Sequence, residues 1–152
     1  MIHQIFIAPD FRSAQKTVSQ VQLKAGLGIV GDRNFGKSQH PGQNVTFIEK
    51  EAIDAYNADH DQSISPDATR RNIITKDIHL NELVGKTFRI GDVKFFGVEL
   101  CQPCSKLGSD LSNETISDKD VIKAFLNKGG LRANVLTDGD ISVGMKLSLP
   151  NP

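Results

Sequence analysis

The sequence lacks several features that would direct it to a particular partner. Its 18 Lys and Arg residues balance 18 Asp and Glu residues, so the net charge is +0 at neutral pH and no overall field attracts nucleic acid or an anionic membrane. No apolar run approaches the roughly 18 residues of a membrane-spanning helix. The N-terminal residues 1–11 lack the charged head and cleavage site of a signal peptide. We therefore expect a cytoplasmic protein that binds neither nucleic acid nor membrane.

Cysteine is scarce, and both cysteines lie in one short segment. Cys101 and Cys104 are separated by two residues, and two thiols are too few for a disulfide scaffold. In a reducing compartment such a pair points to catalysis or metal binding. Pro103 stiffens the segment, and the ammonium group of nearby Lys106 favours a thiolate.

The spacing of the pair leaves four interpretations open. A zinc half-site needs further ligands, and the four histidines provide no second ligand pair of the usual spacing; they are His3, His40, His60 and His79. A thioredoxin-type dithiol needs a helix that begins at the pair, and residues 105–113, which include Gly108, predict a poor helix. A single thiolate acting as a soft metal ligand or a sulfur carrier is the third interpretation. Thiols without a chemical role are the fourth.

Length and composition suit one domain with a single core. The chain has 152 residues, 38% of them hydrophobic, and no linker, low-complexity tract or repeat divides residues 1–152. Apolar segments predict strands at residues 2–8, 19–23, 43–48, 72–75, 86–90, 93–100, 131–137 and 143–149. Gly91-Asp92 predicts a two-residue hairpin turn, and residues 138–140 predict a longer turn within a C-terminal hairpin.

In two segments the apolar residues are spaced as in a helix rather than as in a strand. Apolar residues recur at helical spacing near residues 49–60. Ser117 with Asp120 resembles a capping box at the start of a second helix, which Gly129-Gly130 ends. About eight short strands and two helices favour a small β-barrel or sandwich over a doubly wound α/β sheet.

A glycine-rich stretch satisfies two nucleotide-binding patterns. Residues 26–31 match G-x-G-x-x-G, and residues 31–38 match G-x-x-x-x-G-K-[ST]. Each pattern holds phosphate only when a helix follows at once, and Gly36, Pro41 and Gly42 interrupt such a helix. We interpret the stretch as a loop between strands.

Basic residues recur in or beside the predicted loops, namely Arg33, Lys37, Arg70, Arg71 and Arg132. Taken singly, each of these residues is interpreted as an ordinary charged side chain in solvent. Together with Asn72 and Asn134 they would form a pocket for a phosphate and a polar heterocycle, because guanidinium groups bind phosphate through paired donors.

Several ordered segments resemble the MOSC domain family, named for the C-terminal domain of molybdenum cofactor sulfurase, in its small stand-alone bacterial form. The resemblance covers about residues 20–149, and its order and spacing are more specific than the glycine patterns. The segments are Gly28–Arg33, Asn44–Ile48, Arg71–Thr75, Ile90–Val93, Cys101–Leu107, Gly129–Leu136 and Gly139–Gly144.

This resemblance implies a mainly β, barrel-like fold with two or three short helices and a site for the molybdenum cofactor. Its position in the P-C-x-x-L segment makes Cys104 the cysteine that in relatives ligates molybdenum or is proposed to carry sulfur. Relatives often place His after G-D-R, where this chain has Asn34, so that histidine's role is not carried over. The cofactor-binding residues implied by the match are Arg71, Asn72, Arg132, Asn134, Gly31 and Asp32.

The resemblance leads to three candidate functions. In the first, the Cys104 thiolate coordinates molybdenum and the protein reduces N-hydroxylated or N-oxygenated small molecules with electrons from a partner protein. In the second, Cys104 carries a persulfide received from a PLP-dependent cysteine desulfurase, and Cys101 resolves it as a disulfide. This chain itself is expected to bind no PLP. The third is a non-enzymatic binding module.

Overall fold

The computed structural model describes residues 1–39 and 41–149, and most of its regular structure is strand. The strands in these ranges are β1 (Ile2–Ile7), β2 (Lys16–Val18), β3 (Gln20–Lys24), β4 (Gly28–Ile29), β5 (Val45–Glu49), β6 (Ile73–Thr75), β7 (Thr87–Ile90), β8 (Val93–Leu100), β9 (Leu131–Val135), β10 (Gly139–Ser142) and β11 (Leu147–Ser148). The helices are α1 (Lys50–Asp59), α2 (Ser105–Leu111) and α3 (Asp118–Ala124), with 3-10 turns η1 (Pro66–Thr69) and η2 (Leu80–Leu83). The predicted mainly β class with short helices is confirmed.

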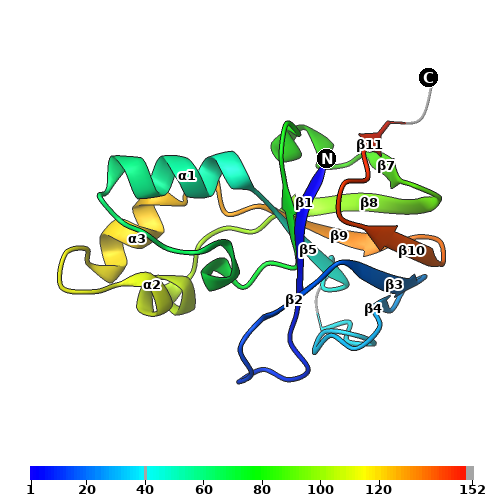
Figure 1. Ribbon diagram of the computed structural model, residues 1–152, viewed down its shortest axis with the longest axis horizontal. Coiled ribbons are helices and arrows are strands. Elements are labelled where there is room, and N and C mark those ends of the chain that lie inside the picture. Colours follow the sequence, from blue (N-terminus) through cyan, green and yellow to red (C-terminus); the bar gives the residue numbers. More distant parts are fainter. Residues whose placement is uncertain (40, 150–152) are drawn as a thin grey trace.

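The strands form one large curled sheet and one small sheet. The eight-stranded sheet has the order β11-β7-β8-β9-β5-β6-β1-β2, and the three-stranded sheet has the order β10-β3-β4. β5 and β6 are parallel, with α1 in the connection between them, and the other paired strands are antiparallel. The large sheet curls around the small one, which gives the half-barrel seen in Figure 1.

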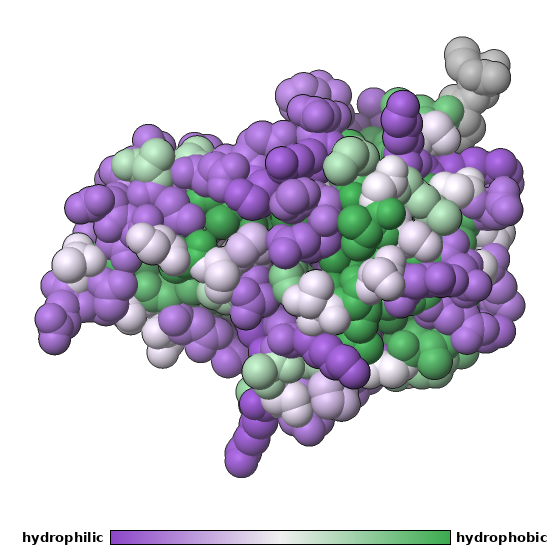
Figure 2. Space-filling view, in the orientation of Figure 1, coloured by the Kyte–Doolittle hydropathy of each residue, from purple (hydrophilic) through white to green (hydrophobic). Residues whose placement is uncertain are grey.

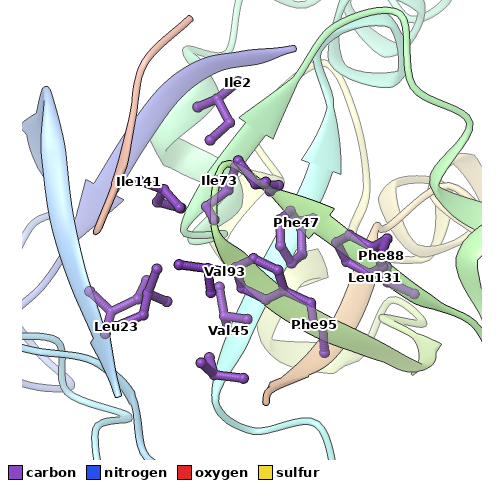
Figure 3. Packing of buried hydrophobic residues seen from close by; sticks show 14 of the residues in the cluster. Ile2, Leu23, Val45, Phe47, Ile73, Phe88, Val93, Phe95, Leu131 and Ile141 are labelled. Atoms are coloured by element: carbon purple, nitrogen blue, oxygen red, sulfur yellow. The ribbon is translucent and has the colours of Figure 1, made fainter. Parts of the chain in front are cut away.

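The hydrophobic core has two parts. Inside the curl, Phe47, Phe88 and Phe95 contact one another with ring centroids 5.3–5.7 Å apart, and Leu23 and Ile141 of the small sheet face this layer (Figure 3). Full burial of one such side chain stabilises the fold by roughly 1.5–3 kcal/mol. The second cluster joins the large sheet to the helices.

The helices lie together at one end of the molecule, and β7, β10 and β11 lie at the other (Figure 1). The face shown in Figure 2 is mainly hydrophilic over the helices and shows apolar residues where β1 approaches the small sheet. Partly buried apolar residues such as Ile7 and Val18 cover the first cluster from β1 and β2.

Several predicted elements are confirmed. Gly91, with φ +58°, begins a two-residue turn that pairs β7 with β8 so that Ile90 is opposite Val93. The first predicted helix is α1. The second is α3, and its N-cap Ser117 accepts a hydrogen bond from the backbone amide of Asp120 at 3.2 Å.

The expectation that residues 105–113 form a poor helix is wrong, because residues 105–111 form α2. The reason is tertiary packing around Gly108. A Cβ at this position would lie 2.9 Å from the backbone oxygen of Asp118 and 3.1 Å from the side chain of Ile122. The low helix propensity of glycine is therefore overridden by a close approach of α2 to α3 that only glycine permits.

The predicted C-terminal hairpin is also wrong. β9 pairs with β8 and β5, β10 pairs with β3, and β11 pairs with β7. Residues 139 and 140, expected in a turn, begin β10. Turn residues between two apolar segments predict that the segments pair with each other. Here each strand instead pairs with a strand distant in the sequence, because that pairing buries its apolar side chains in the core.

The glycine-rich stretch forms no nucleotide-binding element in the described residues. After β4, residues 30–39 and 41–44 contain only turns, bends and unassigned backbone, and the next element is strand β5. A phosphate-binding loop of either type requires a helix at this point. The interpretation of this stretch as a loop is confirmed.

Candidate functional site

Four arginine side chains meet at one small pocket beside β5 and β9. The pocket has a volume of about 160 Å³ and is lined by Arg33, Asn34, Gln43, Thr46, Arg70, Arg71, Cys101 and Arg132. None of these lining residues is acidic, so the pocket is strongly cationic. We call it the arginine pocket.

The arginines come from three separate parts of the chain. Arg33 lies in the loop after β4, Arg70 and Arg71 connect η1 to β6, and Arg132 lies on β9. The antiparallel register of β5 and β9 places Thr46 opposite Arg132. The sheet therefore fixes the floor of the pocket, and two loops supply most of its charge.

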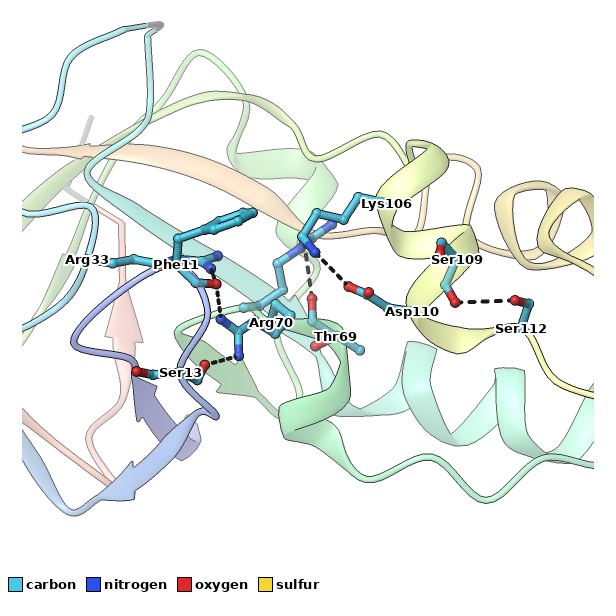
Figure 4. Close-up of polar contacts among 10 residues, drawn as sticks. Phe11, Ser13, Arg33, Thr69, Arg70, Lys106, Ser109, Asp110 and Ser112 are labelled. Carbon is cyan, nitrogen blue, oxygen red and sulfur yellow. Dashed lines mark hydrogen bonds and ion pairs between the residues drawn. The ribbon is translucent and has the colours of Figure 1, made fainter.

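Backbone carbonyl groups hold three of these guanidinium groups. The carbonyl oxygen of Phe11 accepts hydrogen bonds from Arg70 at 3.3 Å and from Arg33 at 3.4 Å, and that of Ser13 accepts from Arg70 at 2.7 Å (Figure 4). Arg71 donates through Nε to Gly129 at 2.9 Å and through Nη1 to Thr69 at 3.2 Å. Carbonyl oxygens orient the groups without neutralising them.

The charges of the cluster affect one another. Burial lowers the pKa of Arg33, the positive charges of Arg70 and Arg71 lower it further, and Asp32 acts in the opposite direction. Arg132 differs from the others because its Nε lies 3.7 Å from a carboxylate oxygen of Glu99 in a partly exposed ion pair. The fold therefore gathers positive charge where an anion would relieve the repulsion.

Cys104 lies at the N-cap position of α2 and is exposed. A hydrogen bond from the backbone amide of Leu107 lowers the pKa of its thiol, and partial burial opposes that effect. The backbone amide of Lys106 and the charges of Arg71 and Arg132 lower the pKa further. Cys104 does not line the arginine pocket, but two arginines of that pocket favour its thiolate.

Cys101 has the opposite environment. It is 2% exposed, and burial raises the pKa of its thiol against the effect of Arg71 and Arg132. Its backbone amide donates to the carbonyl oxygen of Gly130 at 2.8 Å. Cys101, rather than Cys104, lines the arginine pocket, and its raised pKa disfavours the thiolate.

Asn72 lies next to the pocket but is engaged in joining strands. It is 3% exposed, and its side-chain oxygen accepts hydrogen bonds from the amide and the hydroxyl of Thr46, each at 3.2 Å. Its side-chain nitrogen donates to the carbonyl oxygen of Phe6 at 3.2 Å. Asn72 thus positions Thr46, which does line the pocket; cofactor contact by Asn72 itself stays a prediction.

Asp32 and Gly31 shape the loop that carries Arg33. The buried carboxylate of Asp32 accepts hydrogen bonds from the amides of Ala8 at 3.1 Å and Asn34 at 3.3 Å. Gly31 adopts φ +89° in the exposed turn before it. Asp32 therefore ties the loop to the end of β1 and fixes the approach of Arg33 and Asn34 to the pocket.

Asn134 is not brought to the arginine pocket. Its side-chain oxygen accepts a hydrogen bond from the amide of Gly42 at 3.1 Å, and it lines a different pocket together with Lys37 and Ser38. Of the predicted site residues, the structure brings Arg71 and Arg132 together in one pocket and places Asn134 at another.

The sequence patterns predict no ligand role for three of the lining residues. Asn34 departs from the family pattern, and Gln43 and Thr46 belong to the strand predicted at residues 43–48. Thr46 had a weak signal, since it alternates with the buried Val45 and Phe47 along β5. Gln43 precedes that strand and had no signal.

Two other expectations concern metals and membranes. In residues 1–39 and 41–149 no group of three or more His, Cys, Asp or Glu side chains is placed to hold a metal ion, although a protein zinc site uses three or four such ligands; His40 lies outside the described residues. Within the same ranges, no helix has the length and apolar character needed to cross a bilayer.

Comparison with known proteins gives a consistent family assignment. A family model described as the MOSC domain matches residues 33–148. No curated protein sequence matches significantly.

Solved structures share the fold. The chain aligns with the YuaD protein from Bacillus subtilis with a TM-score of 0.80 and 17% identity, covering 96% of this chain and 92% of that one. It aligns with YiiM from Geobacillus stearothermophilus with a TM-score of 0.77 and 18% identity over 99% and 75% of the two chains. For YiiM from Escherichia coli the values are 0.69, 17%, 100% and 71%.

Proposed function

Because the chain belongs to the MOSC domain family, we propose that it binds the molybdenum cofactor, with the phosphate of the cofactor in the arginine pocket and the Cys104 thiolate as a ligand of the metal. The observation that carries this proposal is the convergence of four guanidinium groups on a pocket whose described lining has no acidic residue. Guanidinium groups bind phosphate through paired, charge-assisted hydrogen bonds.

The donor set of the chain fits such a group. A thiolate is a soft ligand of the kind that transition metals in sulfur-rich cofactors accept, and hydrogen bonds and positive charges lower the pKa of Cys104. The thiolate is exposed, so its coordination needs no opening of the core. Arg71 and Arg132 contribute to both parts of the site, because they line the arginine pocket and also lower the pKa of the Cys104 thiol.

The proposed reaction is the reduction of N-hydroxylated or N-oxygenated small molecules. For a hydroxylamine, two electrons from a partner protein and two protons convert the N–OH group to N–H and release water. When bound, the cofactor would supply a redox-active metal that exchanges the two electrons with the substrate. The residues of this chain hold the phosphate, present the thiolate and orient polar groups through Asn34, Gln43 and Thr46.

The test is the metal and pterin content of protein expressed in a host that synthesises molybdopterin. We expect near-stoichiometric molybdenum and pterin in the wild type and in Cys101→Ala. Cys104→Ala loses molybdenum, and Arg71→Gln loses both pterin and molybdenum. Metal-free, pterin-free wild-type protein from this host would contradict the proposal, as would a Cys104→Ala variant that keeps the wild-type molybdenum content.

A second candidate is a sulfur carrier, and the exposed, thiolate-favouring environment of Cys104 supports it. Thiolate attack on a desulfurase persulfide forms a new S–S bond at Cys104 and releases the desulfurase thiolate. After incubation with a PLP-dependent cysteine desulfurase and cysteine, this function predicts a mass increase of one sulfur atom on Cys104. Cys101 is buried and its thiol pKa is raised, so it would need local opening before it resolves the persulfide. A folded protein that fails both tests would be the non-enzymatic binding module.

A further inference from the structure

A second, wider pocket shares Arg70 with the arginine pocket. It has a volume of about 440 Å³ and is lined by Phe11, Arg12, Ala68, Arg70, Lys106 and Asp110. This volume lies in the range of small-molecule sites, whereas the arginine pocket is smaller. Lys106 lies two residues after Cys104, so the wider pocket adjoins the segment that carries the thiolate.

The ring of Phe11 forms an exposed wall of this wider pocket. It is 58% exposed, although an aromatic ring of this size usually contributes to a core. Its loop is fixed, because the carboxylate of Asp10 accepts hydrogen bonds from the amides of Arg12 and Ser13 at 2.9 and 3.0 Å. The Phe11 carbonyl is also the acceptor for Arg33 and Arg70. The ring is thus presented to solvent by an ordered turn.

The charges around this ring are mostly positive. The ammonium of Lys106 lies 5.3 Å from the ring centroid (Figure 4), a distance typical of a cation–π contact. Arg12 and Arg70 add two further positive charges, and Asp110 is the one acidic residue in the described lining. Asp110 lies 3.5 Å from Lys106 in an exposed ion pair, and such pairs hold their partners weakly.

We propose that this wider pocket binds a planar aromatic molecule that carries a carboxylate. The aromatic ring packs against Phe11 and the small side chain of Ala68, and the carboxylate pairs with Arg12 and Arg70. As a binding site, the pocket stands on its own contacts. Its role as the substrate site rests on the proposed function, and there it selects N-hydroxylated substrates that are both aromatic and anionic.

The binding test uses three small probes and the full-length protein without metal or pterin. Benzoate has both features, benzamide lacks the charge and cyclohexanecarboxylate lacks the aromatic ring. Binding is followed by saturation-transfer and chemical-shift titration in NMR. We expect benzoate to bind at least about threefold more tightly than either of the other two, since a single stacking or charge-assisted contact contributes about that factor or more.

Two variants locate the bound probe. Phe11→Leu keeps an apolar side chain but removes the ring, and we expect benzoate to bind about three- to tenfold more weakly. Phe96→Leu is the matched control, because Phe96 is also a surface phenylalanine but does not line this pocket; its affinity for benzoate should equal that of the wild type. Lys106→Gln removes the positive charge that lies 5.3 Å from the Phe11 ring centroid in the same pocket, and it should also weaken binding.

Other outcomes would overturn the proposal. Benzoate that binds Phe11→Leu and Lys106→Gln as tightly as the wild type, and that inorganic phosphate displaces completely, would be bound in the arginine pocket. Equal affinity for benzoate and cyclohexanecarboxylate would exclude aromatic recognition, and equal affinity for benzamide would exclude recognition of the charge. Absence of binding at about 10 mM probe would exclude the site, because even fragment-sized ligands reach millimolar affinity.

Failure of this inference is distinguishable from failure of the proposed function. Cys104→Ala should lose molybdenum and keep benzoate binding, whereas Phe11→Leu should keep molybdenum and lose affinity. In loaded wild-type protein, an aromatic hydroxylamine with a ring carboxylate should show a lower KM than the same compound without it. That difference should shrink in Arg12→Gln and Lys106→Gln, which each remove a positive charge from the pocket lining, and a KM ratio unchanged by both variants would contradict the substrate role.

Discussion

Cys101 and Cys104 lie three positions apart in the chain, yet their thiols have opposite environments. Cys101 is buried and its pKa is raised, while Cys104 is exposed and its pKa is lowered. Both feel the charges of Arg71 and Arg132. The difference comes from α2, whose first backbone amides reach Cys104, and from the core, which encloses Cys101.

The two thiols should therefore react very differently with iodoacetamide. The thiolate is the reactive form, so Cys104 should be alkylated first, with a pH midpoint below the ordinary value of a cysteine thiol. Cys101 should react only in urea, because burial both shields it and raises its pKa. Peptide mapping by mass spectrometry against pH measures this, with Cys101→Ser and Cys104→Ser as controls. Equal labelling of both cysteines in the folded protein would contradict these environments.

Phosphate should stabilise the protein through the arginine pocket. An anion that binds only the folded state raises stability by about 2.7 kcal/mol when its concentration is 100 times its dissociation constant. Arg33→Gln should lose most of this gain. Without phosphate at low salt, the same variant should be within about 0.5 kcal/mol of the wild type, because it removes a charge repelled by Arg70 and Arg71.

Thermal unfolding with and without phosphate measures this effect. Arg89→Gln is the control, since Arg89 is exposed on β7 and does not line the pocket. It should keep the full phosphate-dependent rise in Tm. A rise that is the same in Arg33→Gln and Arg89→Gln would place the phosphate elsewhere.

Removing the side chain of Asn72 should destabilise the fold directly. Asn72→Ala leaves the amide of Thr46 and the carbonyl of Phe6 without their buried partner, at a cost of about 2–4 kcal/mol. Asn81→Ala, which removes an exposed hydrogen bond to Asn127, should cost less than about 1 kcal/mol. Urea unfolding monitored by circular dichroism compares the two. Equal losses would mean that Asn72 does not join the strands.

Gly130 should tolerate no side chain. It has φ +105°, and a Cβ there would lie 1.9 Å from the backbone oxygen of Phe47, so Gly130→Ala should cost more than about 3 kcal/mol through overpacking and strain. Gly36→Ala is a matched control with φ +76° and nothing within 4 Å, and it should cost about 1 kcal/mol. Urea midpoints that fall equally in both variants would contradict the close approach of β9 to β5.

Much of the fold could be predicted from local pattern. The β7–β8 hairpin followed from Gly91-Asp92, and α3 followed from its cap at Ser117. α2 could not be predicted, since the apparent helix breaker Gly108 is the residue that lets α2 and α3 pack closely. The strands that pair with β10 and β11 are distant from them in the sequence. The residues of a short strand do not specify which distant strand it will pair with.

The sequence by itself determined the mainly β class, the family resemblance and the basic residues that form the site, because these depend on residue type and spacing. Only the tertiary structure decided that Arg33, Arg70, Arg71 and Arg132 share one pocket, that Asn72 joins strands, and which of the two cysteines is exposed with a lowered thiol pKa. The physical reason is that burial, hydrogen bonding and charge proximity depend on distances between residues that are far apart in the chain.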